Sequence, residues 1–87
     1  MKLKKEYICR KVAGTWVVME IGAKSINADT VLVLNDTGAL LWKHLAEGAS
    51  RESMAQALVT EYEIDQTIAL RDVENFIEAM HKLNCID

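Results

Sequence analysis

Few side chains of this 87-residue chain could do chemistry, and they are scattered along it. The two histidines, His44 and His81, each stand beside apolar neighbours in a helical pattern. An acid or base must lie within hydrogen-bond reach of its substrate, and the sequence has no HExxH motif, glycine-rich phosphate loop or GxSxG motif to bring such groups together. The sequence therefore predicts no catalytic residue, no bound cofactor and no enzyme activity.

The two cysteines predict neither a zinc site nor a disulfide framework. Cys9 and Cys85 lie near opposite ends of the chain, with no CxxC pair and no histidine at ligand spacing. We expect two reduced thiols, and a bridge between the termini is the alternative. The glutamates between residues 47 and 63 are explained by a solvated helix face, so no metal ligand is predicted.

The length and composition predict one domain, residues 1–87, with a modest core. No apolar run approaches the ~20 residues that cross a bilayer, and no apolar segment of signal-peptide length follows the lysine-rich start. We therefore expect a cytoplasmic protein with no membrane contact. The net charge is −3, yet residues 1–11 hold five of the ten basic residues. This basic segment could attract an acidic partner, or it could simply be a solvated first strand.

The elements that must position any site are three strands followed by three helices. Apolar and β-branched residues predict strands at 7–12, 15–20 and 31–34, with a tight hairpin at Ala13-Gly14. Capping residues and helical periodicity predict helices that start at 35 or 36, at 51 and after Asp65. Strands followed by helices indicate an α+β domain with the helices packed on a three-stranded antiparallel sheet.

The third predicted strand, VLVL at 31–34, does not alternate apolar and polar residues. In a strand meander it would be an outer edge with apolar side chains on both faces, and nothing in it blocks pairing with another strand. Such an edge is either covered or used to bind an extended peptide by strand addition. The third helix, with Val73, Phe76 and Ile77, is the expected wall beside it. Gly38 predicts that the start of the first helix lies close to this strand or its neighbours.

The last two helices could form a helix-turn-helix, which makes DNA binding an obvious hypothesis. Residues 65–83 contain four acidic and two basic side chains, a net charge of −2 without histidine. Phosphates repel such a helix, so we predict no DNA binding. Trp42 follows Leu41 directly and cannot share its direction. We expect it in the core, with contact to a partner as the alternative.

Several segments together resemble a known family. They are LNDTGA at 34–39 with Trp42 after it, EYEID at 61–65, and Asp72-Val73 followed by Phe76. In order and spacing they are similar to the PqqD-like family, over about residues 7–86. Members are small peptide chaperones that form the recognition element for precursors of ribosomally synthesised and post-translationally modified peptides (RiPPs).

The resemblance implies a winged helix-turn-helix-like fold in natural product biosynthesis. It further implies that a precursor's leader peptide binds as an extra strand on the third strand, beside the third helix. The peptide is thereby presented to a modifying enzyme, often a radical SAM enzyme. By position, this implies a peptide-binding site at Thr30, Val31, Leu32, Val33, Leu34, Asp72, Val73, Phe76 and Ile77.

Two other hypotheses remain. The first is a winged-helix transcriptional regulator, whose DNA binding would weaken steeply as salt rises. The second is a dimerisation scaffold, a homodimer in which VLVL pairs with its copy on another subunit. In that case the self-paired edge would have to open before a peptide could be added.

Overall fold

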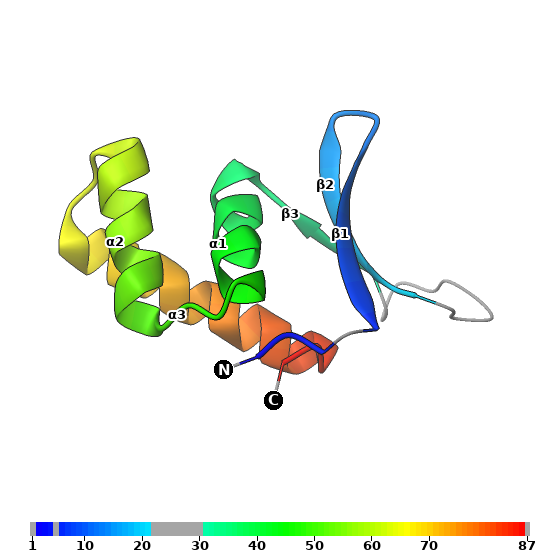
Figure 1. Ribbon diagram of the computed structural model, residues 1–87. Helices are drawn as coiled ribbons and strands as arrows, with labels where there is room; N and C mark the ends of the chain where they lie inside the picture. Colours follow the sequence, from blue (N-terminus) through cyan, green and yellow to red (C-terminus); the bar gives the residue numbers. More distant parts are fainter. Residues whose placement is uncertain (1, 5, 22–30, 87) are drawn as a thin grey trace.

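The computed structural model describes residues 2–4, 6–21 and 31–86, and it has three antiparallel strands followed by three helices (Figure 1). The predicted α+β order is confirmed. The elements are β1 (Tyr7–Val12), β2 (Thr15–Glu20), β3 (Val31–Leu34), α1 (Asp36–Ala46), α2 (Arg51–Tyr62) and α3 (Gln66–Leu83).

The sheet is a meander with the order β1-β2-β3, so β3 forms one edge. The predicted hairpin joins β1 to β2, and both of its turn residues have positive φ, 51° for Ala13 and 83° for Gly14. This is the backbone of a type I′ turn, which matches the twist of the two strands. β2 pairs with β3 in a register that places Trp16 opposite Leu34 and Val18 opposite Leu32.

The two faces of the sheet explain why β3 does not alternate. Directly opposed residues project to the same face, so Leu32 shares a face with Val18, which is fully buried against the helices. Val33 and its partner Val17 project to the other face, where no described helix covers them, and Val33 is 62% exposed. Both faces of β3 are therefore apolar, but only one is part of the core.

The side chain of the residue just before each helix caps its N-terminus. The Asn35 Oδ1 atom accepts from the Gly38 N–H at 2.8 Å, and the Asp65 Oδ1 atom accepts from the Thr67 N–H at 2.9 Å. Ser50 and Ser53 form a reciprocal capping box at the start of α2. Because these bonds satisfy backbone N–H groups that lack a partner within the helix, they fix where the helices begin.

Gly38 lies where α1 starts, against the end of β3. A Cβ atom at this position would stand 3.2 Å from the Leu34 Cδ2 atom and 3.3 Å from the Asn35 Oδ1 atom. These distances are shorter than the roughly 3.5–4.0 Å of an optimal contact. The expected close approach of helix to strand is confirmed, and it brings the edge of the sheet next to the first turn of α1.

The core lies between the inner face of the sheet and the helices, and α3 provides the largest share of it. Of the apolar stripe at helical spacing on α3, Ala69, Val73, Phe76, Ile77 and Met80 are buried, and Leu83 at the end of the helix is half-buried. α2 packs mainly on α3 and reaches away from the sheet, while α1 lies between α2 and the sheet (Figure 1).

Trp42 is 8% exposed and belongs to this core, as expected. α3 contacts both α2 and α1, and α1 in turn contacts β3.

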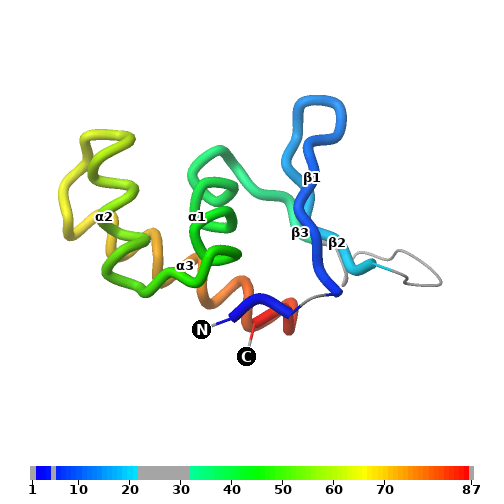
Figure 2. Tube along the Cα trace, viewed as in Figure 1, coloured from blue at the N-terminus to red at the C-terminus, as the bar shows by residue number. Residues whose placement is uncertain are grey.

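The two ends of the described chain lie side by side (Figure 2). Leu3 forms an isolated antiparallel bridge with Ile86, and the Lys4 N–H donates to the Cys85 carbonyl at 2.8 Å. The Tyr7 hydroxyl donates to the Leu83 carbonyl at 3.1 Å. These bonds fasten the start of the chain to the end of α3.

Both cysteines are free thiols, so the bridge between the termini does not form in this structure. Cys85 is fully buried, and burial raises the pKa of its thiol from the ordinary value of 9.0 to about 11. Its Sγ lies 3.4 Å from the Met80 Sδ and 3.5 Å from the Met80 carbonyl. Burial also raises the pKa of the half-buried Cys9 thiol.

We expect the free energy of unfolding to fall as pH rises from about 9 to about 11. In that range the Cys85 thiol of the unfolded chain loses its proton while the buried thiol keeps it, so the unfolded state binds fewer protons. Urea unfolding between pH 8 and 11, compared with a Cys85→Ala variant, measures this effect. Parallel pH curves for the two proteins would contradict it.

Candidate functional site

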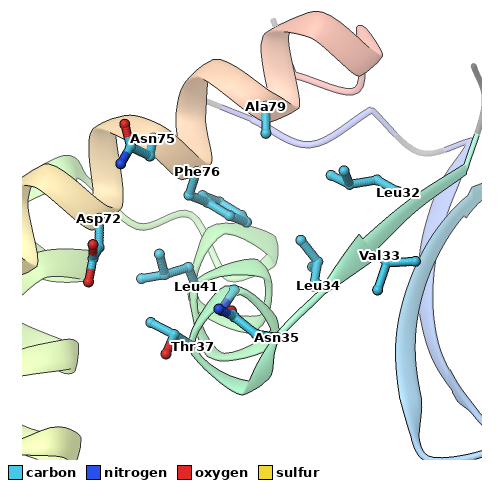
Figure 3. Close-up of a pocket in the computed structure, with 11 residues that line it drawn as sticks. Leu32, Val33, Leu34, Asn35, Thr37, Leu41, Asp72, Asn75, Phe76 and Ala79 are labelled. Carbon is cyan, nitrogen blue, oxygen red and sulfur yellow. The ribbon is translucent and has the colours of Figure 1, made fainter.

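A cavity of about 350 Å³ lies between the free edge of β3 and α3, with the start of α1 as its floor (Figure 3). We call this cavity the edge groove. It is lined by Leu32, Val33, Leu34, Asn35, Thr37, Gly38, Leu41, Asp72, Asn75, Phe76 and Ala79.

Regular spacing on α3 builds one wall of the edge groove. Asp72, Asn75, Phe76 and Ala79 follow each other at intervals of three, one and three residues, which places them on one side of a helix. Asp72 stands at one end of this row and Ala79 at the other, with Ala79 on the side of Leu32 (Figure 3). The wall is therefore polar at one end and apolar at the other.

β3 forms the opposite wall. Leu32 and Leu34 turn toward α3, whereas Val33 turns its side chain away to the outer face of the sheet (Figure 3). The small residues Gly38 and Ala79 leave the space between the walls open. An extended chain laid along β3 would consequently direct every second side chain into the edge groove.

The two edges of the sheet differ in how they are protected. β1 carries the exposed basic residues Arg10 and Lys11, and charge on an edge strand discourages pairing with another strand. β3 carries no charge, and the chain has no proline. Each edge strand lines a cavity, but only β3 offers its backbone N–H and C=O groups without charged side chains on the strand.

Ionisable groups are sparse in the edge groove. Among the described residues that line it, Asp72 is the only charged one, and none is a histidine or cysteine. Within residues 2–4, 6–21 and 31–86, no three His, Cys, Asp or Glu side chains gather as metal ligands would. The groups with raised pKa values, Tyr7 and the two thiols, lie outside the groove. In the same ranges, no helix is long and apolar enough to cross a membrane.

The edge groove brings together five of the residues expected at a binding site. They are Leu32, Val33, Leu34, Asp72 and Phe76. The other four are placed differently. Val73 and Ile77 are 0% and 2% exposed and lie within the core, Val31 belongs to β3, and Thr30 lies outside the described residues.

Sequence reasoning missed six lining residues, Asn35, Thr37, Gly38, Leu41, Asn75 and Ala79. Two of them, Asn75 and Ala79, could have been predicted from their spacing. They lie three and seven positions after Asp72, and residues at these intervals share a helix face.

A second cavity of about 680 Å³ lies along the other flank of α1. It is bordered by Trp16, Trp42, Lys43, Ala46 and Tyr62, among others. No residue of β3 lines it, but Cys9 and Lys11 of the other edge strand, β1, do. It is aromatic and carries charges of both signs, and the two cavities share no lining residue.

The fold and the edge groove together define a small winged helix-turn-helix-like domain whose third strand is an edge of the described sheet. The chain belongs to the PqqD family, because the model of that family, coenzyme PQQ synthesis protein D, matches residues 15–86. No curated protein matches the chain in a sequence search.

Two solved structures resemble the whole domain. One is TbiB1 in complex with the TbiA(beta) leader peptide, with a TM-score of 0.79 and 21% identity, covering 100% of this chain and 95% of that chain. The other is a lasso peptide synthetase B1 complexed with its leader peptide, with a TM-score of 0.74 and 27% identity, covering 98% of this chain and 93% of that chain. The predicted fold class and the predicted family are both confirmed.

Proposed function

We propose that this protein binds the leader of a ribosomally made precursor peptide by adding it as a fourth strand to β3. The observation that carries the proposal is the uncharged edge of β3 beside the edge groove. Main-chain bonds to the edge would supply affinity, and the groove would select the side chains that face α3. The protein has no catalytic role in this scheme. It presents the precursor to a separate modifying enzyme, such as a radical SAM enzyme, in the cytoplasm.

Membership of the PqqD family and the two leader-peptide complexes support this proposal over DNA binding. The charge of α3 supports it as well, since acidic residues on that helix would repel phosphates. Binding is expected to be modest, because a flexible peptide loses conformational freedom as it docks.

The proposal is tested with the leader of a precursor encoded near this gene. Titrating it into the labelled protein should shift the backbone amide NMR signals of β3, Val31–Leu34. A second series methylates one peptide backbone nitrogen at a time. Because neighbouring N–H groups of a strand point in opposite directions, affinity should fall at every second position and persist at those between. Shifts confined to other elements, or losses without a period of two, would contradict strand addition.

A further inference from the structure

Asp72 is the one charged side chain among the described residues that line the edge groove. Asp72 is half-buried, and among the residues that the structure describes its carboxylate forms no ion pair. The two ion pairs of the described chain, Arg51 with Glu74 and Lys82 with Glu78, lie elsewhere. Among the residues that the structure describes, no lysine or arginine lines the groove. A cation brought into it would therefore meet an anion without competition from these described basic side chains.

The neighbours of Asp72 suit a hydrogen-bonding cation. Thr37 and Asn75 line the same groove and supply a hydroxyl and an amide oxygen. Figure 3 shows these side chains at the end of the groove away from Leu32. A lysine or arginine carries three to five N–H donors and a long apolar stem, so it can extend past Leu41 and Phe76 and place its charge at Asp72.

The other end of the edge groove suits an apolar side chain. Ala79, Phe76 and Leu32 surround it, and none of the described lining residues there is polar (Figure 3). Asp72 and Ala79 are seven residues apart on α3, which is about 10 Å along the helix axis. On a strand, side chains that face the same way are spaced by two residues, or about 6.7 Å. The two ends of the groove are thus farther apart than two such peptide side chains. A long lysine or arginine side chain can span the additional distance to Asp72.

We infer that the peptide bound in the edge groove carries a lysine or arginine directed at Asp72, two residues away from an apolar side chain that lies between Leu32 and Ala79. This inference rests on the proposed function and specifies the chemistry of its peptide. Asp72 is then a specificity-determining residue, and β3 supplies the affinity that does not depend on sequence.

The test is a selection from a library of random twelve-residue peptides displayed on phage. The library is selected on four proteins, namely the unchanged chain, Asp72→Asn, Asp72→Lys and Glu78→Gln. Glu78 is an exposed acid on the same helix that does not line the edge groove, so Glu78→Gln removes the same charge without touching the site. Selected peptides that shift the amide NMR signals of β3 are then sequenced and compared.

For the unchanged protein and Glu78→Gln, we expect enrichment of lysine or arginine two positions from an apolar residue. Asp72→Asn should lose the enrichment, and Asp72→Lys should select aspartate or glutamate at that position. A synthetic peptide from the first pool should bind Asp72→Asn about fivefold more weakly, and replacing its basic residue with glutamate should restore tight binding to Asp72→Lys.

Two results would overturn the inference, and they differ in meaning. If all four proteins select the same charges in peptides that shift β3, Asp72 does not determine specificity while the proposed function stands. If no selected peptide shifts β3, the inference and the proposed function fall together.

Discussion

The Val33→Pro variant should stay folded and lose leader binding by about hundredfold. Proline lacks the backbone N–H and its ring obstructs a strand that approaches along the edge. Losing a main-chain hydrogen bond and distorting its neighbour removes about 3 kcal/mol of binding free energy, or about two powers of ten. Val33 is the suitable position because its side chain is 62% exposed on the outer face of the sheet, so little core packing is lost. Fluorescence anisotropy with a labelled leader measures the change.

The control is Val33→Thr, which keeps the β-branched shape and the backbone N–H, and should bind within about twofold of the unchanged protein. Circular dichroism must show that the proline variant retains its helices and sheet. A folded Val33→Pro protein with unchanged affinity would exclude strand addition at β3. If this variant unfolds, the methylated peptide series asks the same question without any change to the protein.

The Ala79→Trp variant should block the edge groove and weaken leader binding at least about tenfold. Ala79 is half-buried, and its side chain faces Leu32 across the groove (Figure 3). An indole at this position would occupy the space that an apolar peptide side chain needs. It would enter a cavity of about 350 Å³ rather than the packed core, so the melting temperature should change little.

A matched control exists on the other flank of α1. Ala46 is exposed and borders the second cavity, so Ala46→Trp introduces the same side chain away from β3. We expect that variant to bind the leader as the unchanged protein does. Equal losses in the two variants would contradict the assignment of binding to the edge groove.

Much of this fold could be predicted from the sequence because its signals are local. The caps Asn35, Ser50 and Asp65 mark the helix starts, and these bonds involve residues only two or three positions apart. The pair Ala13-Gly14 sits between two strand-like segments and forms the turn between them. Such patterns depend on neighbouring residues, so the rest of the molecule seldom changes them.

The site is harder to predict, because it depends on how α3 is rotated against the sheet. Apolar spacing correctly identified Val73 and Ile77 as residues of the inner side of α3, and for that reason they are buried too deeply to line a cavity. Asn75 and Ala79, the two lining residues of α3 that were not predicted, flank the apolar side of the helix. Their place in the groove depends on how α3 lies against α1 and how α1 lies against β3, which contacts between separate elements determine.

The outer face of the sheet, where Val33 is exposed, affects which residues of a leader peptide can be substituted without loss of binding. A strand added to β3 would send alternate side chains to opposite sides, one set into the edge groove and the other beside Val33 in the open. The two sets would have separate roles. The first would contact this domain, and the second would remain available for contact with another protein that binds the complex. Substitutions in one set would leave the other intact. A leader peptide could therefore continue to bind this protein while changes in its outward-facing residues allow recognition by a different modifying enzyme.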